Sequence, residues 1–383
     1  MSGDAASAAG ANRAAGHGVG NTAGSTAGRT AGSERVAGIA VAAGTPRLLD
    51  GLRVLDLTRN LPGPFATRLL ADLGARVIKV EPPEGDPARQ IGALHARLND
   101  GKDLRTVDFK SPQGIAQILD WAAEADVVVE GFRPGVLAAM GLGFDVLRQR
   151  QPRIVLCSVT GYGQTGPWAQ RAGHDLNYMA VSGVLDQCRS LGGEPAMANV
   201  QWGDLAGGSS MACIALLAAL QAAQRTGRAQ HVDVSMTHAL HAHLVMAQST
   251  APLLQPLLGH APGAGEDMLN GALPCYRLYR TADDRWLAVG ALEHKFWKAA
   301  SQAFGHPEWA ERHWQRGMLP HTPPSKALID EVAAVVAAQP LAVWVERFEG
   351  VDACVTAVPS LAEAEPIWSR RPVDPCSTSC GVV

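Results

Sequence analysis

Residues 52–80 read LRVLDLTRNLPGPFATRLLADLGARVIKV, and this stretch decides the fold. Its two ends, 52–57 and 76–80, are rich in aliphatic and β-branched residues and predict strands. Between them the spacing of apolar residues over 65–73 predicts a helix, which ends at Gly74. A strand, a helix and a second strand in this order form a βαβ unit, which joins parallel strands.

The same pattern recurs along the chain. A Ser-Pro pair opens a predicted helix at 111–125, which leads into a buried strand at 127–129. Further strands are predicted at 153–159 and 230–235, and a long helix rich in Ala and Leu, 204–224, stands between them. Alternating strands and helices predict an α/β fold with a doubly wound, parallel, Rossmann-like sheet.

A second compact unit follows the sheet. Residues 276–279 and 286–290 alternate as strands do and flank an Asp-Asp turn, so they predict a hairpin in a smaller α+β domain. We therefore expect a large α/β domain, a helical linker, the small domain and an atypical tail, at residues 47–235, 236–270, 271–357 and 358–383. Residues 1–46 contain no Leu, Ile, Phe, Tyr or Trp before Ile39, so this segment is predicted to be disordered.

Composition excludes several classes of function. The 383 residues carry 33 basic and 36 acidic side chains, a net charge of −3, so no nucleic-acid partner is expected. The most apolar run, 211–220, is too short to span a bilayer, and no secretory signal is visible, so no membrane partner is expected either. Seven cysteines without a CxxC pair predict free thiols and a cytoplasmic location.

Five blocks then occur in the order typical of one family. They are GLRVLDL (51–57), DLGARVIKVE (72–81), EGFRPGV (130–136), GYGQTGP (161–167) and GHDLNY (173–178). Together they resemble the family III CoA-transferase superfamily, which includes formyl-CoA transferases, carnitine CoA-transferases and α-methylacyl-CoA racemases. The resemblance covers roughly residues 48–365. The last block is similar to the racemase branch, because transferases usually lack its histidine.

The resemblance implies an acyl-CoA substrate, no metal and no cofactor beyond the CoA of the substrate. A racemase would interconvert (R)- and (S)-2-methylacyl-CoA thioesters by moving the proton beside the thioester carbonyl. This reaction passes through an enolate and needs a base, an acid on the opposite face and donors for the enolate oxygen. The resemblance assigns the two proton carriers to His174 and Asp204, and assigns Glu293 to hydrogen-bond His174.

The residues alone favour simpler interpretations of these three positions. A single histidine in a loop is usually a surface or capping residue, Asp204 would serve as a helix N-cap, and Glu293 as a solvated residue at a helix start. The small residues after Asp204, including Gly207 and Gly208, are predicted to let a thioester approach the backbone closely.

CoA carries phosphates and an adenine, and the resemblance implies which residues bind it. Arg133 would stack on the adenine or pair with a phosphate, and Arg89 would reach a phosphate. Pro82 replaces an arginine that racemases often place against the nucleotide. The remaining predicted binding residues are Val107, Asp108, Phe109, Lys110, Gly173, Asp175 and Tyr178.

Two other functions remain open. A CoA-transferase would use Asp204 as a nucleophile and form an acyl anhydride and then an aspartyl-CoA thioester. A silent CoA-binding or scaffold protein would do neither. In the family two subunits interlock, so the resemblance implies a homodimer with its active sites at the interface. The tail, 368–383, resembles no return segment of the family, and we expect reduced stability from it.

Overall fold

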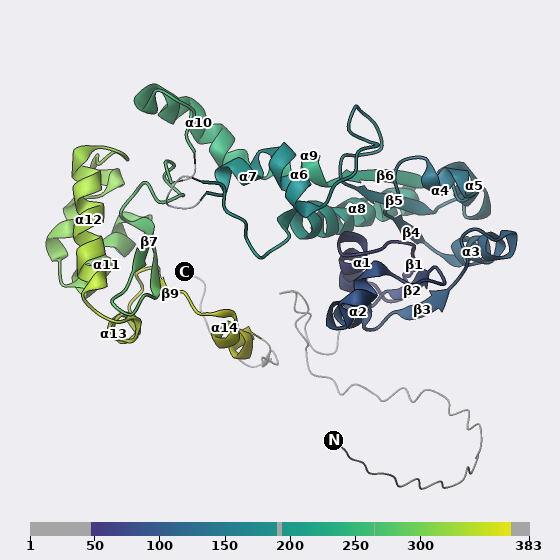
Figure 1. Cartoon of the computed structure of the whole chain (residues 1–383), viewed down its shortest axis with the longest axis horizontal. Helices are drawn as coiled ribbons and strands as arrows, with labels where there is room; N and C mark the ends of the chain where they lie inside the picture. The colour runs from purple at the N-terminus through teal and green to yellow at the C-terminus, as the bar shows by residue number, and fades with distance from the viewer. Residues whose placement is uncertain (1–46, 190–193, 264, 369–383) are drawn as a thin grey trace, which may run out of the picture.

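The structure is a computed structural model that describes residues 47–189, 194–263 and 265–368 (Figure 1). The predictions for 1–46 and for most of the tail lie outside the described residues.

A six-stranded parallel sheet forms the centre of the large domain. Its strand order is β3-β2-β1-β4-β5-β6, and every neighbouring pair is parallel. The strands are β1 (Arg53–Asp56), β2 (Arg76–Glu81), β3 (Asp103–Thr106), β4 (Val127–Glu130), β5 (Val155–Thr160) and β6 (Gln230–Ser235). The order reverses between β1 and β4, which is where ligands bind in doubly wound folds. The predicted α/β class is confirmed.

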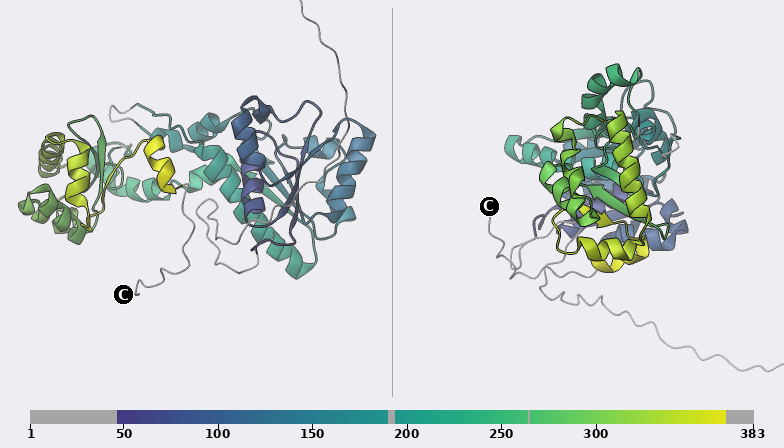
Figure 2. Two further views of the ribbon diagram at one scale, coloured as in Figure 1. Left: turned by 90° about the horizontal axis from the view of Figure 1, so that it is seen from below. Right: turned by 90° about the vertical axis from the view of Figure 1, so that its left-hand side faces the viewer.

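Helices cover both faces of this sheet (Figure 2). On one face, α1 (Pro62–Asp72) and α8 (Met211–Thr226) pack on Val54, Val77 and Val127. On the other, α3 (Pro112–Glu124) and α5 (Phe144–Arg150) pack on alternate residues of the same strands. The other large-domain helices are η1 (Pro87–Gln90), α2 (Gly92–Asn99), α4 (Val136–Ala139), α6 (Asp175–Ser182), α7 (Val184–Gln187) and η2 (Gly203–Ser210). After β6 follow the helices α9 (Met236–Ala242) and α10 (Val245–Leu258).

The small domain has its own antiparallel sheet and its own core. The sheet order is β7-β8-β9, and the fully buried Trp297, Trp309 and Trp344 fill the core. Figure 1 shows this domain apart from the parallel sheet, with α10 between them. Its elements are β7 (Tyr276–Arg280), β8 (Trp286–Gly290), α11 (His294–Phe304), η3 (Pro307–Glu311), η4 (Trp314–Arg316), α12 (Pro323–Ala337), α13 (Leu341–Phe348), β9 (Val355–Ala357) and α14 (Leu361–Trp368). The predicted small α+β unit is confirmed.

One continuous helical stretch among the described residues, Gly203–Thr226, is long and apolar enough to cross a membrane by composition. The pair α12 and α13 passes the same test together, but it bends by 104°. Gly203–Thr226 packs against β5, β6 and α1 in the core of the large domain, as buried helices of globular domains do.

Candidate active site

The loops that follow the parallel strands gather at the carboxyl edge of the sheet. The predicted CoA-binding segment 107–110 follows β3, and Arg133 follows β4. Phe109 and Phe132, one from each loop, meet edge-to-face with ring centroids 6.1 Å apart. The fold therefore brings the two predicted nucleotide-binding segments together, although they come from strands that are not neighbours.

The members of these segments differ in exposure. Val107 is 5% exposed and belongs to the core, whereas Asp108, Lys110 and Arg133 are exposed. The Asp108 carboxylate accepts a hydrogen bond from the Lys110 backbone N–H at 2.8 Å, so it shapes the turn. Arg89 is paired with the buried Glu81, with Nε 2.7 Å from the carboxylate, and half of its side chain stays exposed.

His174 stands at the start of α6, at its N-cap position, and is exposed. Its backbone N–H donates to the side-chain oxygen of Asn177 at 3.1 Å, which fixes the first turn of the helix. The next residue, Asp175, accepts a hydrogen bond from the backbone N–H of Asp204, 3.0 Å from its Oδ1. Thus one side chain links the segment that carries His174 to the segment that carries Asp204.

Asp204 lies in the first turn of η2, which is a π-helix. The sequence predicted an α-helix from 204 to 224 with this residue at its N-cap, but the N-cap is Trp202 and the first eight residues are wound more widely. Such π segments often occur at functional sites. The carboxylate accepts no hydrogen bond from the described residues.

The glycines of η2 serve helix packing rather than substrate approach. A Cβ on Gly203 would come within 2.8 Å of the Asp175 carboxylate, and one on Gly207 within 2.8 Å of the Met236 carbonyl oxygen. Gly207 and Gly208 are buried against protein atoms. The prediction that they admit a thioester is therefore wrong for these two positions; they let α9 approach η2.

The surroundings of Asp204 favour the protonated form of its carboxyl group. Burial, together with the neighbouring Asp175, raises the pKa of Asp204 to about 7. Burial also raises the pKa of Tyr178 to about 12, and the charges of Asp204 and Asp175 add to this effect, whereas Arg133 opposes it. Tyr178 donates from Oη to the Gly173 carbonyl. Asp175 thus contacts the Asp204 backbone, Tyr178 bonds to Gly173 and feels the charge of Asp204, and Arg133 acts on Tyr178.

Glu293 is not part of this group within the single chain. It is exposed at the N-cap of α11 in the small domain, and its carboxylate forms no hydrogen bond with His174 in the described residues. Its hydrogen bond to His174 stays a prediction for an assembly in which a second subunit contributes to the site.

Sequence reasoning missed Arg59. Its guanidinium carbon lies 5.4 Å from the centroid of the Phe132 ring, in the loop after β1. The available signal was its position directly after a strand of a parallel sheet, where ligand-binding loops begin.

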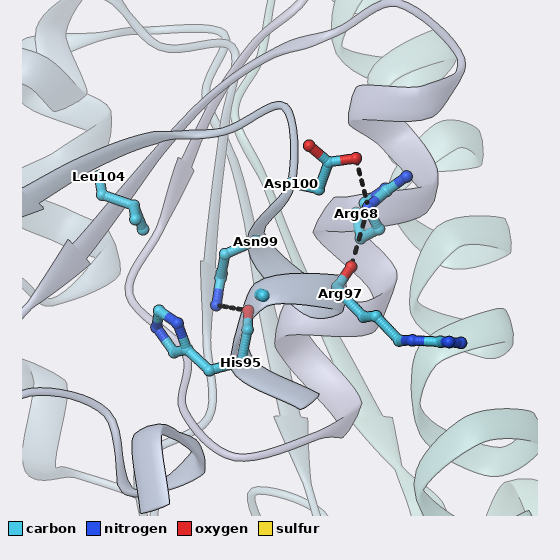
Figure 3. Close-up of a pocket in the computed structure, with 7 residues that line it drawn as sticks. Arg68, His95, Arg97, Asn99, Asp100 and Leu104 are labelled. Atoms are coloured by element: carbon cyan, nitrogen blue, oxygen red, sulfur yellow. Dashed lines mark hydrogen bonds and ion pairs between the residues drawn. The ribbon is translucent and has the colours of Figure 1, made fainter. Parts of the chain in front are cut away.

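A separate hollow of about 540 Å³ lies beside α2 (Figure 3). Arg68 spans it, with Nη1 2.8 Å from the Arg97 carbonyl oxygen and 3.3 Å from the Asp100 carboxylate. The lining residues are Arg68, His95, Ala96, Arg97, Asn99, Asp100 and Leu104. None of the predicted site residues lines it, so we do not place the reaction there.

Comparison with known proteins identifies the family of the chain. A family model described as CoA-transferase family III matches residues 49–371. The chain is 35% identical over 320 residues to the alpha-methylacyl-CoA racemase of Homo sapiens, covering 82% of this chain and 78% of that protein. It is 34% identical to the succinyl-CoA:glutarate CoA-transferase of Mus musculus, with 79% and 70% covered. The crystal structure of Rv3272 from M. tuberculosis matches with a TM-score of 0.68 at 31% identity, covering 85% and 86%.

The fold and the site together define a class of protein. It is a two-domain α/β protein with a half-buried aspartate at the edge of the parallel sheet where the strand order reverses. The chain belongs to CoA-transferase family III, and is an enzyme of the superfamily that unites these transferases with the racemases.

Proposed function

We propose that the protein interconverts (R)- and (S)-2-methylacyl-CoA thioesters by moving the proton beside the carbonyl. The observation that carries this proposal is the link from His174 through Asp175 to Asp204. With a pKa near 7, the Asp204 carboxyl can take or return a proton at neutral pH, which a general base must do. His174 supplies the complementary carrier, because its exposed imidazole can both accept and donate a proton.

The surroundings of Asp204 suit an apolar acyl chain. Trp202 is 46% exposed and precedes Asp204 by two residues, and Leu176 is 42% exposed and follows Asp175, which bonds to the Asp204 backbone. Apolar side chains of this size left open to solvent are common where a ligand covers them.

The decisive experiment incubates the enzyme with a 2-methylacyl-CoA in heavy water and follows deuterium at the α-carbon. Deuterium uptake without a second acid is expected. His174→Ala should reduce it at least about a hundredfold, since general acid-base groups contribute roughly 10²–10⁴ in rate, while CoA affinity stays within about twofold of the wild type. His243→Ala, an exposed histidine on the α9–α10 connection, is the matched control and should exchange normally. Normal exchange by the His174 variant would return that residue to a structural role.

A CoA-transferase is the second candidate, because a transferase is also among the relatives and because no hydrogen bond from the described residues restrains the Asp204 carboxylate. In that reaction Asp204 would attack the thioester carbonyl, expel the CoA thiolate and form a mixed anhydride. Hydroxylamine would convert this acyl-aspartate to a hydroxamate, detectable by mass spectrometry on the peptide that contains residue 204. CoA transfer to an added carboxylic acid, together with this adduct and without α-deuterium, would replace the racemase proposal.

The remaining expectations belong to the same proposal. The reaction needs no cofactor beyond the CoA of its substrate, so activity should survive exhaustive dialysis against a chelator. The enzyme acts in the cytoplasm, which cell fractionation tests.

A second copy of the chain completes the active site, which is consistent with the exposed position of Glu293. Mixing inactive His174→Ala and Glu293→Gln subunits should therefore restore partial activity.

A further inference from the structure

Four charged side chains meet beneath the end of β1 with no solvent exposure. Lys79 Nζ lies 3.1 Å from the Asp86 carboxylate and 4.0 Å from that of Asp56. Lys102 Nζ lies 3.2 Å from the other oxygen of Asp56. Buried ion pairs often add little to stability compared with apolar side chains of the same size. Stability alone therefore gives no reason for this cluster, and its contacts must be considered.

Three of the four side chains hold the loop after β1. Asp56 accepts a hydrogen bond from the Thr58 backbone N–H at 2.9 Å, and the Lys79 ammonium donates to the Thr58 carbonyl oxygen. Asp86 accepts from the Asn60 backbone N–H at 3.0 Å. Asn60 has a φ of 67°, a left-handed conformation that costs free energy in a residue other than glycine. Buried anchors on both sides hold the backbone in this strained turn.

Arg59 is the residue between these anchors. Because the backbone is fixed on both sides, the direction of its Cα–Cβ bond is fixed, and its guanidinium carbon lies 5.4 Å from the centroid of the Phe132 ring. Phe132 in turn contacts Phe109, so the guanidinium stands among the segments predicted to bind the nucleotide.

We propose that Lys79 and Asp86 are positioning residues that fix the loop at 58–60, and that through it they aim Arg59 at a phosphate of CoA. This inference rests on the proposed function, because that function requires CoA to bind. To the proposed function it adds Arg59 as a residue that binds the nucleotide, and Lys79 and Asp86 as the residues that hold Arg59 in place. Preorganising a charged donor before the ligand arrives reduces the entropy cost of binding.

Lys102 offers a matched control. Its side chain is equally buried and also pairs with Asp56, but its other partners are the Pro64 carbonyl oxygen and the Thr67 hydroxyl in α1, each at 2.8 Å, and the Asn99 side-chain oxygen at 3.3 Å. Among the described residues it forms no hydrogen bond or ion pair with residues 58–60. Both lysine variants remove one buried charge from the same cluster, and only one of them releases the loop.

The experiment measures the affinity of CoA by titration calorimetry for the full-length wild type and for Arg59→Ala, Lys79→Met, Asp86→Ala and Lys102→Met. The melting temperature of each variant is measured in parallel. Loss of a charge-assisted contact to phosphate should weaken Arg59→Ala by roughly tenfold or more. Lys79→Met and Asp86→Ala should weaken binding by about three- to tenfold, and Lys102→Met by less than about twofold, although all three lower the melting temperature.

The double variant Arg59→Ala/Lys79→Met gives the sharpest result. If Lys79 acts through Arg59, the double variant binds CoA no more weakly than Arg59→Ala alone. Additive losses, or equal losses for Lys79→Met and Lys102→Met, would overturn the positioning role while the wild type still binds CoA. A wild type without affinity for CoA would instead overturn the proposed function and this inference together. If neither Lys79→Met nor Asp86→Ala folds, the cluster is a requirement of the fold and the inference is also overturned.

Discussion

At the scale of single residues, Asp204 should make the stability of the protein depend on pH. Its pKa is raised from 3.8 to about 7, so the folded state holds the proton more tightly than the unfolded chain. The stabilisation from this protonation is complete below about pH 4 and is lost as the pH rises through about 7. Asp204→Asn stays neutral throughout. Its melting temperature should therefore exceed that of the wild type at pH 8, and the difference should shrink towards pH 5.

A difference in melting temperature that stays constant between pH 5 and pH 8 would contradict this prediction. It would show that Asp204 is solvated in both states, which is incompatible with a proton carrier tuned to neutral pH. The same variant should show no α-deuterium uptake, so stability and activity change in opposite directions, as expected for a strained catalytic group.

The residues of the candidate site were only partly predictable. His174, Asp175 and Tyr178 share one block, and their proximity follows from the start of a helix. The bond between Asp175 and the Asp204 backbone joins positions 29 residues apart, which no local pattern reveals. Arg59 was missed because a single arginine in a loop has no periodicity. Its orientation depends on two buried anchors, Lys79 in β2 and Asp86 at the N-cap of η1.

At the scale of elements, the packing of η2 against α9 should control the position of Asp204. Gly207→Ala would bring its new methyl group within 2.8 Å of the Met236 carbonyl oxygen, which is backbone and cannot turn away. We expect a loss of about 1–3 kcal/mol in the free energy of unfolding, typical of overpacking, and at least a tenfold loss of exchange activity. Gly92→Ala, where a methyl group meets nothing within 4 Å, is the control and should be neutral. Unchanged activity in the Gly207 variant would show that the packing of η2 against α9 does not control catalysis.

The elements themselves show which sequence signals are dependable. Strands β4 and β5 are buried along their whole length, and such continuous apolar runs predicted them. Strand β3 was missed because it lies at the edge of the sheet with all four residues exposed, so DLRT carries no apolar pattern. The π-helical winding of η2 was missed for another reason: it depends on hydrogen bonds five residues apart, and composition does not distinguish these from α-helical ones.

At the scale of the whole molecule, the chain has separate cores that share no residue. The cores on the two faces of the parallel sheet draw on residues between Val54 and Leu240, and the small-domain core on residues between Leu273 and Ala353. The most buried tryptophans belong to the small domain. Trp297, Trp309 and Trp344 are at most 2% exposed there, whereas in the large domain Trp168 and Trp202 are 37% and 46% exposed and Trp121 is only partly buried against a core. Tryptophan fluorescence therefore reports chiefly on the small domain.

This separation predicts that the two domains unfold in separate steps. Trp344→Ala removes a fully buried ring that contacts Phe304 edge-to-face, at a cost of about 3–5 kcal/mol to the small domain. In a urea titration its fluorescence midpoint should fall well below that of the wild type. The CoA affinity, which depends on the large domain, should persist to the original urea concentration. A single transition in which fluorescence, circular dichroism and CoA binding coincide would show instead that the interface between the domains makes them one cooperative unit.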